Sequence, residues 1–249
     1  MINAGYDWLP LWLTPWVKPP VFHLISMGDV SDVMRETIEA VAGWDARRLA
    51  FHTRRQADDF RLPLPATVVG NGFDLSRYTM CEGKDGPLGW AGRIAPEKGL
   101  EDAAAAAAAL GERLLVWGLK ENAAYADDVE SRVPPGTINW RGFLPTAELQ
   151  QELGTCRALI NTPKWNEAYG NVVVEALACG VPVVAYDRGG PGELIRSGET
   201  GWLVPADDVG ALTQALREVG SIQRTRCREW VERHACLLYT SDAADETGR

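Results

Sequence analysis

The chain has 249 residues, enough for one large hydrophobic core or two small ones, and its 46% hydrophobic and 24% charged residues are ordinary for a globular protein. Its formal net charge of −9 argues against a general binder of nucleic acids or of anionic membranes. Five cysteines without a CxxC pair predict a reducing, cytoplasmic setting, with neither a disulfide framework nor a zinc site. The sequence has no signal-peptide pattern and no apolar run of about 18 residues, so we expect no membrane-spanning helix.

The first 27 residues are dense in tryptophan and proline. Four prolines between positions 10 and 20 exclude a long helix, and residues 20–25 predict a buried strand. Trp8, Trp12 and Trp16 fit two interpretations. The simpler one is a loop that covers a core, and the other is an interfacial anchor that makes peripheral contact with a membrane.

The next segment alternates between helical and extended patterns and ends in a turn-rich hinge at Val69–Asp74. We place the boundary between two domains near this hinge, so that residues 1–70 form a partial N-terminal domain and residues 71–235 a C-terminal domain. The pattern before the hinge predicts, in order, a helix at 33–44, a strand at 49–52, a helix at 53–60 and an extended segment at 63–69.

Strands and helices also alternate through the second domain, which is typical of a parallel sheet in the α/β class. Thr146 is the expected N-cap of one helix, and Asp207 or Asp208 that of the closing helix. Gly189 and Gly190 open a further turn into a helix. The predicted strands lie at 87–91, 113–118, 137–143, 159–161, 181–185 and 202–204, and the predicted helices at 121–133, 146–153, 172–179 and 207–219.

A basic pair follows the first strand of this domain. Arg93 comes just after the strand, and Pro96 predicts a helix start that the alanine-rich run at 103–109 continues. Lys98 would then lie in the first helical turn, where the helix dipole opposes a cation. The pair is either solvated or suited to a diphosphate, since arginine binds phosphate bidentately and lysine adds a point charge.

The stretch at 159–187 reads as strand, loop, helix, glycine stop and strand, a single βαβ unit. Unpaired backbone N–H groups and the helix dipole favour an anion at the helix start, and Gly170 leaves room for it to approach. Glu167 precedes this helix, and Glu175 follows eight residues later. Both carboxylates can face one crevice and accept hydrogen bonds from sugar hydroxyls, although two unrelated surface glutamates would give the same spacing.

This unit resembles the two-glutamate signature of glycosyltransferase family 4, whose members are retaining enzymes. The neighbouring stretches EALACGVPVVA, GGPGELI and GETGWLV match as well, and the resemblance covers roughly residues 70–220. It implies an α/β fold of the GT-B type, with a Rossmann-like parallel-sheet C-terminal domain and a partial Rossmann-like N-terminal domain. It also implies transfer of a sugar from a nucleotide sugar, such as a UDP- or GDP-sugar, to an unidentified glycan, lipid or small molecule. Neither a metal nor another cofactor is expected.

The resemblance also suggests which residues form the site. Glu167 would orient the donor sugar, Arg93 and Lys98 would hold the diphosphate as in the family's G-R-x-x-x-x-K-G segment, and His23 would lie near the acceptor and the donor sugar. The base would lie beside Trp117 and Gly118 or beside Gly142 and Phe143, although Trp117 also fits a plain core residue. The expected donor-binding residues are Gly92, Arg93, Lys98, Gly170, Asn171, Val172 and Glu175, the last of which would hold the ribose.

Both ends of the chain differ from the family pattern. No glycine-rich loop of the kind that helps to form the acceptor side precedes residue 70, so the N-terminal domain is expected to be about half length. Residues 236–246, CLLYTSDAADE, resemble a translated sequencing adapter and are expected to be non-native. The alternative function is therefore a non-catalytic fragment that binds a nucleotide sugar. A dehydrogenase domain is excluded by the lack of G-x-G-x-x-G at the first βα turn.

Overall fold

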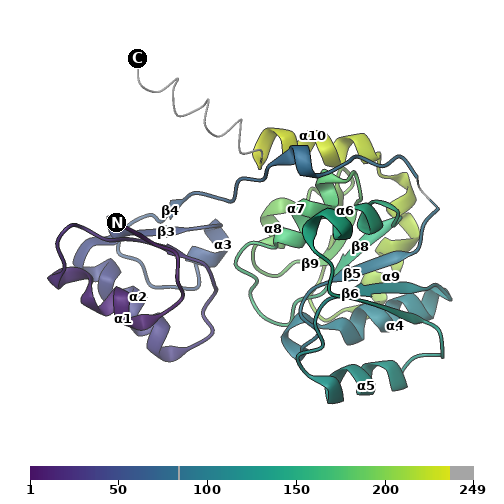
Figure 1. Cartoon of the computed structure of the whole chain (residues 1–249), viewed down its shortest axis with the longest axis horizontal. Helices are drawn as coiled ribbons and strands as arrows, with labels where there is room; N and C mark the ends of the chain where they lie inside the picture. Colours follow the sequence, from purple (N-terminus) through teal and green to yellow (C-terminus); the bar gives the residue numbers. More distant parts are fainter. Residues whose placement is uncertain (84, 236–249) are drawn as a thin grey trace. The chain divides into compact units, whose positions relative to one another are not determined.

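The structure is a computed structural model that describes residues 1–83 and 85–235 (Figure 1). The predicted adapter segment, 236–246, lies outside these residues. The chain divides into two compact units. The first contains Met1–Asn71 together with Asn166–Gly170, and the second contains Gly72–Trp165 and the chain from Asn171 onward.

The first unit is built on a parallel sheet in the order β1-β2-β3-β4. Its α1 and α2 helices pack side by side, and α2 also contacts β3 (Figure 1). The strands are β1 (Ile2–Asn3), β2 (Phe22–Ile25), β3 (Leu49–Phe51) and β4 (Thr67–Val68), and the helices are α1 (Trp8–Leu13), α2 (Asp32–Asp45) and α3 (Arg54–Ala57).

Several predictions for this unit need correction. Strand β2 alternates between exposed and buried residues, with Phe22 exposed and Ile25 buried, so it is not buried throughout. The predicted absence of a long helix at the proline-rich start is confirmed, but this segment is not simply a loop, since it holds the short helix α1. Pro10 is tolerated because it lies near the N-terminus of α1, where the missing N–H costs no helical hydrogen bond. Thr53 caps α3 through the Gln56 N–H, and this helix is shorter than predicted.

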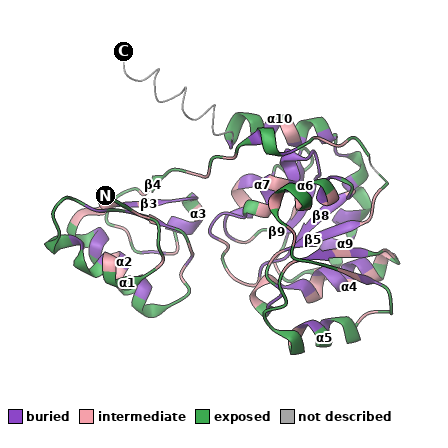
Figure 2. Cartoon of the chain, viewed as in Figure 1, coloured by how far each residue is buried: buried purple, intermediate pink, exposed green. Residues whose placement is uncertain are grey.

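The second unit contains a six-stranded parallel sheet in the order β10-β9-β8-β5-β6-β7. Its central strands β5, β8 and β9 are buried at every position, as expected for a sheet covered on both faces (Figure 2). The strands are β5 (Leu88–Ala91), β6 (Leu114–Trp117), β7 (Ile138–Gly142), β8 (Ala158–Asn161), β9 (Val183–Tyr186) and β10 (Gly201–Val204).

Helices cover both faces of this sheet. The α4, α5 and α9 helices lie on one side and α6, α7 and α10 on the other (Figure 1). The helices are α4 (Leu100–Leu110), α5 (Ala123–Ser131), α6 (Thr146–Gly154), α7 (Asn171–Ala178), α8 (Pro191–Leu194), α9 (Val209–Glu218) and α10 (Arg224–His234).

The basic segment does not form the single helix that the sequence predicts. A short 3₁₀ turn, Pro96–Lys98, is separated from α4 by Gly99, which has a φ of 65°. A Cβ on Gly99 would lie 2.0 Å from the Thr162 carbonyl oxygen, so a loop from another strand imposes this break. Lys98 therefore precedes α4. One cap prediction was wrong, since Pro145 precedes α6 in place of Thr146. The other is confirmed, because Asp208, one of the two predicted candidates, caps α9.

Helix α10 is absent from the predicted elements because its N-cap residue, Gln223, makes no capping side-chain bond. It packs on α7, and its buried Arg224 donates to the carbonyl oxygens of Gly83, Gly154 and Cys156. These bonds connect the segment before β5 to the turn before β8 and to α10.

Candidate functional site

A cavity of about 310 Å³ opens in the second unit at the carboxyl ends of β5, β6 and β7. The parallel arrangement brings these strand ends and the start of α7 to one edge of the sheet, the usual position of ligand sites in such folds. The cavity is lined by Ala91, Gly92, Arg93, Trp117, Gly118, Leu119, Phe143, Leu144, Leu149, Asn171, Val172 and Glu175.

Gly118 allows the turn after β6 to lie close to the turn after β5. Its φ is 148°, and a Cβ there would lie 1.8 Å from the Gly92 carbonyl oxygen. Because any side chain would collide with backbone, the close approach of these two turns requires glycine.

Arg93 and Lys98 share an aromatic neighbour beside the cavity. The exposed Arg93 forms ion pairs with Glu97 at 2.9 Å and with Glu121 at 2.8 Å. Its guanidinium carbon lies 5.8 Å from the centre of the Trp165 ring, and Lys98 Nζ lies 4.8 Å from the same centre. Arg93 lines the cavity, whereas Lys98 is not among the lining residues.

Helix α7 brings its N-terminus and one carboxylate to the same cavity. Asn171 and Val172 line it at the helix start, where backbone N–H groups carry partial positive charge. Gly170 precedes them with a φ of 100°. Glu175 lines the cavity one turn later and accepts a hydrogen bond of 3.3 Å from the Tyr78 hydroxyl. Burial raises the pKa of Glu175, and the bond from Tyr78 and the nearby charge of Arg77 oppose this rise in part.

The loop that carries Glu167 packs with the first unit. Asn166 Nδ2 donates to Asp59 Oδ1 at 2.8 Å, and Thr53 Oγ1 donates to the Ala168 carbonyl oxygen at 2.8 Å. Glu167 and Gly170 therefore belong to the first unit and Glu175 to the second.

His23 is a buried residue of the first unit. Its Nδ1 lies 3.0 Å from Asn3 Nδ2, and its Nε2 lies 2.7 Å from Thr14 Oγ1. Burial lowers the pKa of His23, which favours the neutral imidazole. These contacts give the side chain a structural role, and its predicted place near the acceptor and donor sugar stays a prediction.

Some of the cavity's lining was not predicted. Leu119, Leu144 and Leu149 are ordinary apolar residues whose sequence context carries no ligand signal. Trp117 is both a core residue and a lining residue, and its Nε1 donates to Glu152 at 2.7 Å. Within 1–83 and 85–235, no group of three or more His, Cys, Asp or Glu is placed to hold a metal ion, and no helix is both long and apolar enough to span a bilayer.

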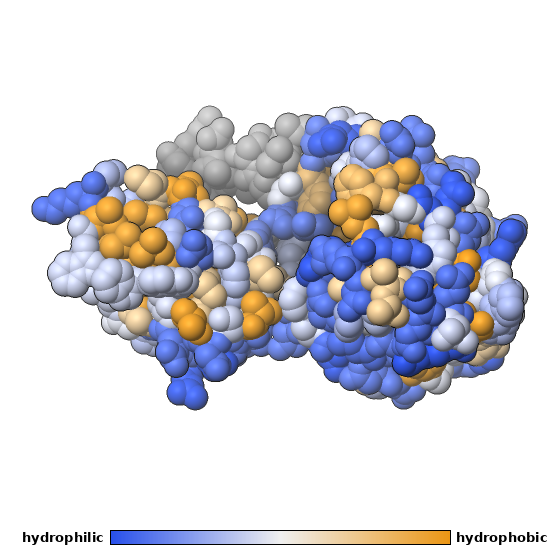
Figure 3. Space-filling model, turned by 60° about the horizontal axis from the view of Figure 1, so that its bottom comes forward, coloured by the Kyte–Doolittle hydropathy of each residue, from blue (hydrophilic) through white to orange (hydrophobic). Residues whose placement is uncertain are grey.

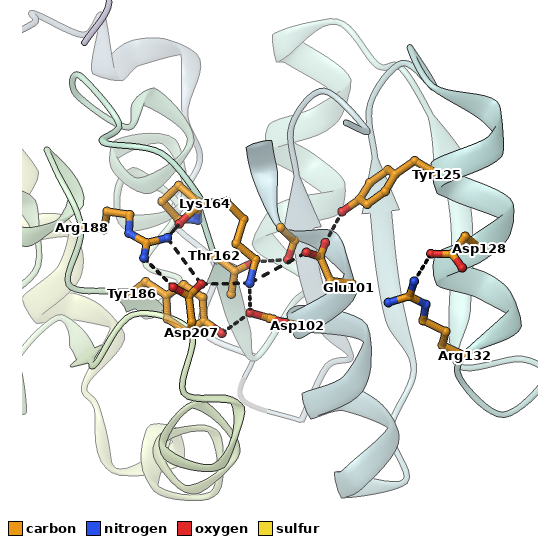
Figure 4. A network of polar contacts seen from close by, with 12 residues as sticks. Glu101, Asp102, Tyr125, Asp128, Arg132, Thr162, Lys164, Tyr186, Arg188 and Asp207 are labelled. Atoms are coloured by element: carbon orange, nitrogen blue, oxygen red, sulfur yellow. Dashed lines mark hydrogen bonds and ion pairs between the residues drawn. The ribbon is translucent and has the colours of Figure 1, made fainter. Parts of the chain in front are cut away.

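A polar network ties together three loops at the carboxyl edge of the sheet (Figure 4). Lys164 Nζ pairs with Asp102 in the first turn of α4 and with Asp207, at 2.9 Å, after β10. Arg188, after β9, also pairs with Asp207, at 2.5 Å, and the Tyr186 hydroxyl donates to Asp102 at 2.5 Å. In each of these pairs the two residues lie far apart in sequence, so the network was not predicted.

Comparison with known proteins places these features in a family. Residues 83–234 match the family described as "Glycosyl transferases group 1". The chain belongs to this family. The match covers most of the second unit, including every residue that lines the cavity.

Individual group 1 glycosyltransferases are similar over parts of the chain. A D-inositol 3-phosphate glycosyltransferase of Rhodococcus erythropolis is 32% identical over 195 residues, 69% of this chain and 43% of that protein. A glycogen synthase of Mycobacterium tuberculosis is 34% identical over 164 residues, 61% of this chain and 39% of that protein. The chain thus spans less than half the length of these relatives.

Solved structures show the fold. A sucrose-phosphate synthase from Thermosynechococcus elongatus has a TM-score of 0.84 at 18% identity, covering 99% of this chain and 73% of that one. Anabaena HepE in complex with UDP and glucose has a TM-score of 0.79 at 16% identity, covering 100% of this chain and 78% of that one. The predicted fold is confirmed: it is the GT-B type, an α/β fold with two Rossmann-like parallel-sheet domains.

Proposed function

We propose that the protein is a retaining glycosyltransferase of family 4 that uses a nucleotide-sugar donor, and that the donor's nucleotide occupies the cavity of the second unit. One observation carries the proposal. Two segments far apart in sequence, the turn after β5 with Gly92–Arg93 and the start of α7 with Asn171, Val172 and Glu175, meet on this cavity with the chemistry that a nucleoside diphosphate requires. The group 1 family match and the UDP named in the HepE structure support it.

Arg93 and Lys98 neutralise the charge that grows on the departing diphosphate. Such prearranged electrostatic stabilisation commonly makes the largest contribution to catalysis of this kind. The N–H groups of Asn171 and Val172 assist from the start of α7, where the helix dipole favours an anion. Gly170 leaves the approach to these groups open.

Glu175 binds the ribose hydroxyls, and Glu167 orients the hydroxyls of the donor sugar. A half-buried carboxylate that lines a cavity is a strong acceptor for a hydroxyl pair. In a retaining transfer of this type the leaving and attacking groups share one face of the sugar, so the two-carboxylate arrangement of retaining glycosidases is not required. The mechanism uses neither a metal nor an organic cofactor. His23 is left outside it because Asn3 and Thr14 already contact both ring nitrogens.

The apolar part of the cavity suits the nucleotide base. Trp117, Leu119, Phe143 and Leu144 surround this part, and their apolar side chains suit contact with a flat ring. The acceptor, whether glycan, lipid or small molecule, is left open, since no described cavity carries a signal for one of these classes.

The donor site can be tested by calorimetric titration of UDP and GDP into the chain and its variants. We expect micromolar binding of one nucleotide and a loss of about tenfold or more in both Arg93→Ala and Glu175→Ala, since each removes a charged hydrogen-bonding group. Arg132→Ala is the matched control, because Arg132 is an exposed arginine paired with Asp128 outside the cavity. Equal affinity in all four proteins, or no binding by the folded chain, would contradict the proposal.

A non-catalytic nucleotide-sugar-binding fragment is the alternative function. It predicts the same nucleotide binding but no sugar transfer. Release of UDP or GDP from the corresponding glucose and mannose donors therefore distinguishes the transferase from the binding fragment. Turnover that disappears in Arg93→Ala supports the transferase. Tight donor binding without turnover, across a panel of glycan and lipid acceptors, supports the binding fragment.

Peripheral membrane contact is a further part of the proposal. Hydrophobic residues gather on the surface of the first unit, at the left of Figure 3. The exposed large side chains of this unit include Trp8, Trp12 and Trp16, the last 78% exposed. Tryptophan prefers the bilayer interface, and Arg48, which lines a surface cavity together with Trp16, suits an anionic head group. Co-sedimentation with phosphatidylcholine–phosphatidylglycerol vesicles should fall when the three tryptophans become serine. Unchanged sedimentation would contradict this contact.

A further inference from the structure

The half-buried Trp165 has no part in the function proposed above, yet it lies at the diphosphate cations. Arg93 and Lys98 both contact its ring, with the guanidinium carbon 5.8 Å and Nζ 4.8 Å from the ring centre. Trp165 is not among the residues that line the cavity, so it acts on the cavity through these two side chains.

An aromatic ring between two cations has a clear electrostatic effect. The negative charge of the π face attracts each cation, and this attraction offsets their mutual repulsion when no anion is bound. A guanidinium has five N–H donors and an ammonium three, so N–H groups on both cations remain able to bind phosphate oxygens. A ring held in place thus fixes where two long, flexible side chains present their charge.

The structure holds the Trp165 backbone from several sides. The Lys164 N–H donates to the Glu97 carbonyl oxygen at 2.9 Å, and Thr162 Oγ1 donates to the Gly99 carbonyl oxygen at 2.7 Å. The Lys164 side chain is anchored by Asp102 and Asp207 in the network of Figure 4. The loop after β8 is therefore fastened to the same 3₁₀ turn that carries Lys98.

We propose that Trp165 is a positioning residue that arranges Arg93 and Lys98 for the diphosphate of the donor. This inference rests on the proposed function. Its consequence is specific: Trp165 strengthens binding of a nucleoside diphosphate relative to the monophosphate and leaves binding of the nucleoside part unchanged. A ring that only filled space would alter both affinities equally or alter stability alone.

The experiment measures that difference directly. UDP and UMP, or GDP and GMP if the chain prefers guanine, are titrated calorimetrically into the unaltered chain, Trp165→Leu and Trp165→Phe. We expect the ratio of the monophosphate Kd to the diphosphate Kd to fall about tenfold in Trp165→Leu, the size of two cation–π contacts. Trp165→Phe keeps an aromatic face and should restore most of the ratio.

Trp140→Leu is the matched control, because Lys120 Nζ lies 3.9 Å from the Trp140 ring centre and this pair lies outside the cavity. The ratio of the monophosphate Kd to the diphosphate Kd in this variant should equal that of the unaltered chain. Thermal unfolding confirms that each variant is folded, and Trp165→Gln replaces the leucine variant if the latter unfolds.

Two results overturn the inference alone: an unchanged ratio in Trp165→Leu, or equal losses for diphosphate and monophosphate. If the unaltered chain binds none of the four nucleotides, the proposed function fails first, and the inference fails with it. The outcomes are thus distinguishable.

Discussion

The two units are made from the same parts, parallel strands joined by helices, but they bury their apolar side chains differently. The central strands of the second unit are buried at every residue (Figure 2). The first unit has strands of two to four residues and exposes aromatic side chains on several elements. These are Trp8, Trp12, Trp16, Phe22 and Trp44.

This difference in burial explains why a ligand site can form in the second unit. A ligand site needs side chains and backbone groups held by packing from all sides, and the second unit offers this at the carboxyl edge of a covered sheet. In the first unit the polar groups mainly fasten loops, as Gln56 does when it donates to the carbonyl oxygens of Ile25 and Met27. The following predictions test this contrast, beginning with the largest effect.

Close backbone packing should make the second unit far less tolerant of a methyl group. Gly118→Ala places a Cβ 1.8 Å from a backbone oxygen and should cost ~4 kcal/mol of unfolding free energy and abolish nucleotide binding. Gly70→Ala in the first unit has a similarly positive φ of 65° but open space around it, and should cost only ~1 kcal/mol. Guanidinium unfolding measures both, and equal losses would remove the contrast.

Removal of a buried polar side chain should also cost more unfolding free energy in the second unit than in the first, with a smaller difference between the two. Arg224→Ala leaves three carbonyl oxygens without their donor and should cost ~3 kcal/mol. Gln56→Ala also loses three bonds, two to backbone carbonyl oxygens and one from the His52 N–H, but no charged group takes part in them, so it should cost only ~2 kcal/mol. Urea unfolding of both variants is the measurement, and a larger loss for Gln56→Ala would show that the first unit depends more on its polar anchors.

Glu175 should lower the stability of the folded chain at neutral pH and strengthen nucleotide binding. Because burial raises its pKa, the folded chain holds this proton more tightly than the unfolded chain, and stability falls as the pH rises from the unfolded pKa through the folded one. Glu175→Gln should therefore gain stability at pH 7, with the gain shrinking toward pH 4, while nucleotide affinity falls about tenfold.

Thermal unfolding between pH 4 and pH 7 measures the first effect and calorimetry the second. The exposed Glu148→Gln serves as the control and should show neither trend. A stability gain that does not depend on pH would mean that the ionised carboxylate is not what costs stability.

The smallest effect should come from the exposed aromatic surface. Trp16→Ser removes a largely exposed side chain and should change the unfolding free energy by less than ~0.5 kcal/mol. Trp90→Ala, in β5 of the second unit, removes a buried one and should cost ~3 kcal/mol. Chemical unfolding compares them, and a large loss in Trp16→Ser would show that this surface is packed in solution.

Local signals in the sequence predicted the α/β class and most strands and helices, since period, caps and glycine stops act within a few residues. They also singled out Arg93 and Glu175, and the resemblance to family 4 added Asn171 and Val172; the structure places all four on the cavity. Strand ends in a parallel sheet share one edge, so a residue just after a strand is a reasonable candidate for a site.

Only the tertiary structure decided which distant residues meet. Gly99 separates Lys98 from α4 because the Thr162 carbonyl lies against it, and Trp165 lies beside two cations from another loop. The loop of Glu167 joins the first unit through Asp59 and Thr53, although its neighbours in sequence belong to the second. Such contacts depend on strand order and loop packing, which no short-range pattern encodes, because residues far apart in the chain carry no mark of which partner they will meet.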